Sequence, residues 1–105
     1  MGRKVLEFRL ADAEAKRLLQ QIAAESDAVH FTQHARQQMR KRKITPLQVI
    51  NCLRKGRITE SPCLDLHGNW QLRIERYACG EEIGCGVAID MTGPKAIVIT
   101  SFRVN

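Results

Sequence analysis

The sequence lacks long apolar runs. None approaches the roughly 20 residues that a membrane-spanning helix requires, and the first ten residues, MGRKVLEFRL, lack the apolar segment of a secretory signal. We therefore expect a cytoplasmic protein with no membrane partner.

Aromatic residues make up only 5% of the chain. Trp70, Tyr77 and three phenylalanines do not form the interleaved pattern of a protein that stacks single-stranded bases. Ser/His/Asp and Cys/His groupings with supporting context are also missing. The glycines of Cys79-Gly80 and of Gly84–Gly86 are expected to flank a turn between strands, so they do not indicate a phosphate-binding loop at the start of a helix.

The four cysteines include no C-x-x-C pair. Without that spacing a zinc knuckle is not indicated, and reduced thiols are the expected state. One alternative is a zinc site made from Cys79, Cys85 and either Cys63 or His67. The expectation is that the protein uses no metal and no cofactor.

What is present points to one folded domain over residues 1–105. A chain of 105 residues with 44% hydrophobic and 27% charged residues can close a single core without disulfides.

The hydrophobic periodicity predicts helices in the first half of the chain and strands in the second. Helices are expected at residues 11–25, from the N-cap Thr32 to Arg42, and from the Thr45/Gln48 capping box to a stop at Gly56. Alternating apolar residues predict strands at 5–10, 70–77 and 85–91, and a weaker strand at 58–66 is interrupted by Pro62. The near-continuous apolar run at 96–102 predicts a strand buried on both faces. These elements predict an α+β fold, in which an N-terminal strand and two to three helices pack on one face of an antiparallel sheet of about four strands.

The net charge of +6 is concentrated in one segment. No acidic residue lies between Asp27 and Glu60. The basic residues in that gap are Arg36, Arg40, Lys41, Arg42, Lys43, Arg54, Lys55 and Arg57. Such a cluster attracts phosphates or an acidic protein partner, and a solvated helix face is the alternative without a partner.

Within the second predicted helix, His34, Gln38 and Arg42 form one row at spacings of four residues, beside the apolar stripe. Arg36 and Arg40 point further toward solvent. A metal-free ribonuclease needs an acid and a base for proton transfer and cations to stabilise the phosphate. His34 supplies the acid or base in this hypothesis, and Arg42, Arg73 or Arg103 clamps the phosphate. In the structural alternative, His34 is only a hydrogen-bonding residue beside the core.

A longer motif runs from His30 to Gly56. The run His30–Arg36, followed by Met39, Arg42, Ile44-Thr45, Val49, Leu53 and Gly56, resembles a family of small bacterial domains of unknown function, and Ala96–Arg103 resembles the closing strand of that family. The resemblance covers residues 29–104.

That family in turn resembles a branch of the fold shared by RelE-type and MqsR-type toxins, barnase-like, EndoU-like and colicin-like ribonucleases, in which helices pack on a curved antiparallel sheet. The resemblance implies a messenger-RNA-cleaving toxin encoded beside an antitoxin. Its signature polar positions fall on His34, Arg36, Arg42, Thr100 and Arg103. The chain departs from the RelE type because it lacks a lysine-rich C-terminus ending in tyrosine.

These observations together predict a metal-independent endoribonuclease of a toxin–antitoxin pair, which cleaves RNA by attack of the 2′-hydroxyl. The expected catalytic residues are His34, Arg42 and Arg103. The expected substrate-binding residues are Arg36, Gln38, Arg40, Arg73 and Thr100. Two alternatives are a non-catalytic basic module that binds nucleic acid or an acidic protein, and a structural protein of a prophage or mobile element.

Overall fold

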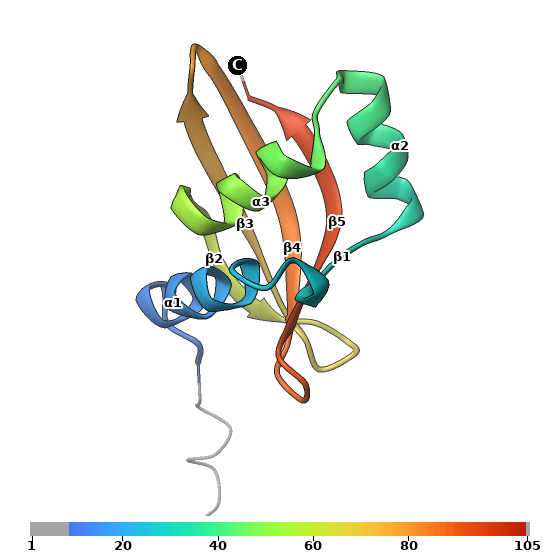
Figure 1. Cartoon of the computed structure of the whole chain (residues 1–105). Coiled ribbons are helices and arrows are strands. Elements are labelled where there is room, and N and C mark those ends of the chain that lie inside the picture. The colour runs from blue at the N-terminus through green and yellow to red at the C-terminus, as the bar shows by residue number, and fades with distance from the viewer. Residues whose placement is uncertain (1–8, 105) are drawn as a thin grey trace, which may run out of the picture.

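The computed structural model describes residues 9–104 (Figure 1). The strand predicted at residues 5–10 falls mostly outside the described residues, and residues 9 and 10 are not part of a strand.

Helix α1, Asp12–Ala23, confirms the amphipathic helix predicted at residues 11–25. Acidic residues in its first turn complement the positive end of the helix dipole. A short 3-10 helix, Ser26–Ala28, follows it. The buried residues of α1 are Ala15, Leu19, Ile22 and Ala23.

Helices α2, Gln33–Arg42, and α3, Pro46–Lys55, begin where their predicted caps place them. At the start of α3, the Gln48 N–H donates to the Thr45 hydroxyl at 3.1 Å and the Thr45 N–H donates to Gln48 Oε1 at 2.8 Å. This reciprocal pair is the predicted capping box.

Gly56 ends α3 as predicted, but in an extended conformation and not in the left-handed one. A Cβ atom at this position would lie 2.5 Å from the Cys52 carbonyl oxygen and 2.7 Å from that of Glu75. The close approach of α3 to the sheet therefore requires glycine here.

Five strands form one sheet in the order β1-β5-β4-β3-β2. They are β1 Val29–Phe31, β2 Arg57–Leu64, β3 Trp70–Ala78, β4 Glu81–Asp90 and β5 Lys95–Arg103. Neighbouring strands are antiparallel except for β1, which pairs with β5 in parallel. The predicted α+β class is confirmed, while the antiparallel sheet of about four strands is corrected to a mixed sheet of five. The missed strand β1 has only three residues, too few to show an alternating pattern.

The outer strand β2 is irregular. It contains Pro62, and its register with β3 shifts between Ile58 and Glu60 and again between Glu60 and Cys63. Proline has no N–H to donate, so an edge strand is where it is tolerated.

The helices and the inward face of the sheet enclose the core. Helices α1 and α3 lie across this face, and α2 lies beside β5 (Figure 1). The core residues from β3 and β4 are Trp70, Leu72, Ile74, Ile83, Cys85, Val87 and Ile89.

The opposite face of the sheet, which we call the open face, has no described helix over it. Its central residues are Gln71, Arg73, Glu75, Gly84, Gly86, Ala88, Ile97, Thr100 and Phe102. The prediction that the last strand is buried on both faces is therefore wrong. Ala96 and Val98 are buried against the helices, but Ile97 and Phe102 on the open face are only half-buried.

Candidate nucleic-acid interface

Helix α2 is held at both ends by local interactions. The Ala35 N–H donates to the Thr32 hydroxyl at 3.0 Å, which caps the first turn. Lys43 ends the helix in the left-handed conformation, with φ of 56°. Between them, Ala35 and Met39 are buried in the core. The remaining faces of α2 are free to carry polar residues.

The solvent side of α2 is strongly basic. Arg36, Arg40, Lys41 and Lys43 are exposed there and take part in none of the ion pairs within residues 9–104. We call these four residues the basic face. Arg36 lies over the Phe31 ring, with its guanidinium carbon 5.5 Å from the ring centre. A surface of unpaired cations attracts a polyanion.

The predicted row of His34, Gln38 and Arg42 lies on the side of α2 next to β5. Arg42 Nη1 donates to Gln38 Oε1 and, at 3.2 Å, to the Ser101 carbonyl oxygen on β5. The Thr32 hydroxyl donates to the Ile99 carbonyl oxygen at 3.1 Å. The row therefore follows the edge of β5 beyond the end of β1.

His34 stands at the exposed N-terminal end of this row. Its imidazole makes no hydrogen bond to another side chain or carbonyl of residues 9–104. It is open to a ligand, but no carboxylate or carbonyl of the described residues orients it.

Arg103 lies against the C-terminal end of α2. Its Nε donates to the Arg42 carbonyl oxygen at 3.0 Å, and its Nη2 donates to that of Lys43 at 3.1 Å. Its Nη1 forms an ion pair with Glu81 at 2.9 Å. Every guanidinium nitrogen thus has a protein acceptor, and the side chain caps the C-terminal end of α2.

The Arg103 ion pair also affects Glu81. Hydrogen bonding and charge attraction from Arg103 hold the pKa of the Glu81 carboxyl below its ordinary value.

Arg73 and Thr100 lie on the open face, in one row across three strands. Arg73 of β3 pairs with Gly86 of β4, which pairs with Thr100 of β5. The Arg73 guanidinium carbon is 4.6 Å from the centre of the Phe102 ring, and Arg73 Nη1 is 3.3 Å from a carboxylate oxygen of Glu60. Both partners orient the arginine without burying it.

Two glycines of β4, Gly84 and Gly86, leave room on the open face for the side chains of β5. A Cβ at Gly84 would lie 2.3 Å from the Phe102 ring, and a Cβ at Gly86 would lie 3.0 Å from the Thr100 methyl. Beside Gly86, a groove of about 260 Å³ runs past Arg73 toward β2.

The structure divides the predicted site residues into two groups. His34, Arg36, Gln38, Arg40 and Arg42 lie on α2, with Arg103 at its C-terminal end, whereas Arg73 and Thr100 lie on the open face. The two groups adjoin at β5, because Thr100 lies between the two residues whose carbonyls accept hydrogen bonds from Thr32 and Arg42.

Sequence reasoning missed Phe102 and the glycines of the open face. Gly84 and Gly86 were expected to flank a turn, but they lie inside β4. A glycine at every second position of a strand, opposite a bulky residue of the next strand, is the signal that would have indicated them.

Two of the four cysteines lie in the core. Cys52 and Cys85 are buried against each other, and contact with Cys85 together with burial raises the pKa of the Cys52 thiol. Among residues 9–104, no three His, Cys, Asp or Glu side chains lie close enough to hold a metal ion.

None of the helices in residues 9–104 is long and apolar enough to cross a membrane.

No curated protein and no solved structure matches the chain. The expected likeness to toxin ribonucleases therefore stays a prediction. One family does match, over residues 31–103, which lie within the range of 29–104 expected from the motif. The chain belongs to this family, which is described as a domain of unknown function (DUF4258).

Proposed function

We propose that the protein is a cytoplasmic, metal-independent endoribonuclease that acts as the toxin of a toxin–antitoxin pair. The observation that carries this proposal is the junction at β5, where Arg42 of α2, the helix that also bears the basic face, adjoins an open sheet face that presents Arg73. RNA is the partner that this combination suits, because phosphates can lie on the basic face while the chain crosses the sheet.

The basic face supplies the binding energy. Arg36 and Arg40 are exposed and form no ion pair within residues 9–104, so a contact with a phosphate releases counterions without breaking an ion pair of this part of the chain. Arg73 adds a positioned guanidinium on the open face, since its weak pair with Glu60 is solvent-exposed and exchangeable.

The proposed chemistry needs proton transfer beside a held phosphate. His34 takes or gives the proton, because it is exposed at the end of the row and has no hydrogen-bond partner among residues 9–104. Arg42 binds the phosphate with Nη2, which has no acceptor in the described part of the chain, while its Nη1 is fixed by Gln38 and Ser101. Arg103 becomes a positioning residue in this scheme, because it holds the carbonyl of Arg42 and does not face solvent with a free nitrogen.

The direct test is RNA cleavage in the presence of EDTA. Purified protein is incubated with a labelled RNA, with and without ribosomes, and compared with His34→Gln and the matched control His67→Gln, which changes an exposed histidine in the β2–β3 loop. We expect products ending in cyclic phosphate, a loss of about 10²- to 10⁴-fold in rate for His34→Gln, and no change for His67→Gln. Intact RNA under all conditions would refute the nuclease activity.

A second candidate is a non-catalytic module that binds RNA. It is favoured by one observation, that no described group orients the imidazole of His34. Salt-sensitive binding of RNA without cleavage, unchanged in His34→Gln, supports this module and excludes the nuclease.

The toxin role has its own test in cells. Expression of the protein should arrest growth, and co-expression of the product of the adjacent gene should relieve the arrest. Cells could instead grow normally while they contain the protein at a concentration that cleaves RNA in vitro. That result would show that the protein is a ribonuclease but not a toxin.

A further inference from the structure

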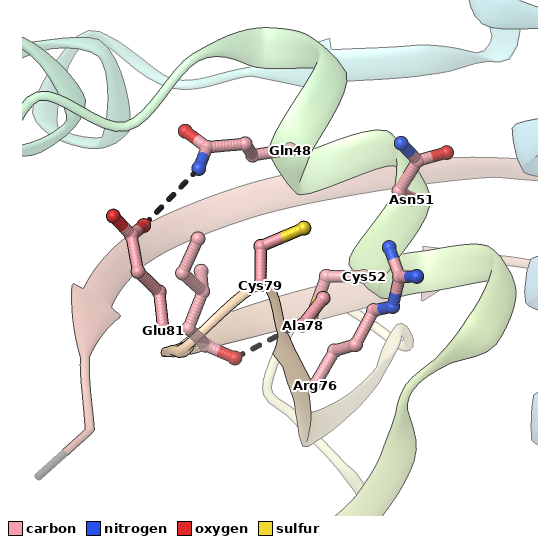
Figure 2. A pocket seen from close by; sticks show the side chains of 8 residues that line it. Gln48, Asn51, Cys52, Arg76, Ala78, Cys79 and Glu81 are labelled. Carbon is pink, nitrogen blue, oxygen red and sulfur yellow. Dashed lines mark hydrogen bonds between the residues drawn. The ribbon is translucent and has the colours of Figure 1, made fainter.

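A second polar site lies on the other side of the sheet, between α3 and the hairpin that joins β3 to β4. It is a pocket of about 370 Å³. Its walls are Gln48, Asn51 and Cys52 of α3, and Arg76, Ala78, Cys79, Glu81 and Ile83 of the hairpin (Figure 2). The pocket faces the helices, so it is separate from the open face.

Arg76 is the notable residue of this pocket. It follows Ile74 on the inward-pointing side of β3, so its side chain is directed at α3 and is half-buried. It forms no ion pair or hydrogen bond with residues 9–104. A half-buried guanidinium without an acidic partner is costly unless water or a ligand compensates it.

Asn51 adds a second free donor. Figure 2 shows its amide on α3 above the Arg76 guanidinium, at the same wall of the pocket. The Asn51 side chain also makes no hydrogen bond within residues 9–104. Two donors from different elements thus converge on one cavity, which is the arrangement of a ligand site.

The acidic residue of the pocket is already occupied. Glu81 accepts a hydrogen bond from Gln48 Nε2 at 3.4 Å, shown as a dashed line in Figure 2, and pairs with Arg103 at 2.9 Å. It therefore does not neutralise Arg76, but its negative charge lies at the same cavity.

We infer that this pocket binds a small monocarboxylate. The planar guanidinium of Arg76 matches a carboxylate with two parallel hydrogen bonds, and the Asn51 amide supplies a third donor. A single free positive charge balances one negative charge, and the Glu81 carboxylate disfavours a phosphate dianion. Ala78 and Ile83 give the apolar wall for a short hydrocarbon chain. The volume is near the lower limit for small-molecule sites.

The inference does not rest on the proposed ribonuclease activity, and its test uses no RNA. The intact protein, labelled with ¹⁵N, is titrated with sodium propionate, propionamide or inorganic phosphate, while NMR follows the side-chain amide of Asn51 and the Nε–H of Arg76. We expect saturable shifts with propionate, a dissociation constant on the order of 1 mM as befits so small a ligand, and neither comparable shifts nor saturation with the other two compounds.

Variants separate the site from general charge effects. Arg76→Gln and Asn51→Asp should each weaken propionate binding by about tenfold or more, since each removes a charge-assisted contact or adds a repulsive charge. Arg54→Gln, which removes an exposed cation from α3, should leave propionate binding unchanged. Asn51→Asp provides a nearly isosteric test if Arg76→Gln fails to fold. Equal shifts with propionamide, tighter binding of phosphate, or unchanged binding in folded Arg76→Gln or Asn51→Asp would each overturn the inference.

Discussion

Arg103 donates from Nε to the main-chain carbonyl oxygen of Arg42 at 3.0 Å, across 61 positions of sequence. This bond joins the last strand to the end of α2, the helix that carries the basic face. The orientation of that helix relative to the sheet therefore depends on Arg103, a residue that the sequence motif alone suggests as catalytic.

The first prediction concerns that bond. Arg103→Gln should lower the free energy of unfolding by about 1 to 3 kcal/mol, because it removes charged donors from two main-chain carbonyls and from Glu81. Arg103→Lys should lose less, since it keeps the charge near Glu81 and the helix end. Urea denaturation followed by circular dichroism measures the difference. A stability equal to that of the native protein in both variants would contradict the capping role.

The second prediction concerns the glycines of β4. Gly84→Ala should cost about 1 to 3 kcal/mol of stability, because the added Cβ would lie 2.3 Å from the Phe102 ring. Gly86→Ala should cost less, since its contact is with a methyl at 3.0 Å. Gly93→Ala is the matched control, as no atom lies within 4 Å of the added carbon. The same denaturation experiment should rank the variants in this order, and an equal loss in all three would show that the contact with Phe102 is unimportant.

The third prediction concerns Glu81 and pH. Because the folded pKa of Glu81 lies below its ordinary value of 4.5, the ionised form stabilises the fold above that pH, and this contribution is lost as the pH falls through the folded pKa. The native protein should be more stable than Glu81→Gln at about pH 6, and this difference should disappear as the pH falls through the folded pKa of Glu81.

Glu25→Gln controls for this pH experiment, because Glu25 is exposed and forms no ion pair within residues 9–104. Its stability should track that of the native protein at every pH. Parallel curves for the native protein and Glu81→Gln over the whole range would show that the Arg103 pair does not favour the fold.

The fourth prediction concerns the basic face. Arg40→Gln should weaken RNA binding and reduce the slope of log K against log salt by about 0.7, the value for one phosphate contact on a single strand. Arg17→Gln is the control, because Arg17 lies on α1 and is already paired with Glu14. Filter binding at several salt concentrations measures both slopes. An equal change of slope in the two variants would show that RNA does not bind at the basic face.

Much of the fold follows from local sequence. The threonine caps at Thr32 and Thr45 mark the starts of α2 and α3, because a cap depends only on residues within one turn. The strands after Gly56 follow from alternation of apolar residues. Strand β1 could not be predicted in the same way, because its pairing with Ala96–Val98 is made across most of the chain.

The site was predictable in part. The row of His34, Gln38 and Arg42 follows from helical spacing, and the contact of Arg42 with Gln38 agrees with it. The capping role of Arg103 could not be inferred, because it depends on where the end of β5 meets the end of α2. The open face was missed for a related reason, since a strand pattern does not show which of its faces lacks a covering layer.

The contacts of α2 with β5 also limit how another protein can associate with the sheet. Beyond the three residues of β1, the carbonyls of Ile99 and Ser101 are already bonded to Thr32 and Arg42. At the other edge, β2 contains Pro62 and two register shifts. Within residues 9–104 neither edge offers a long regular ladder for an added strand, so the sheet resists edge-to-edge aggregation. A protein partner must therefore recognise this domain through side chains on its faces, and not by extending its sheet.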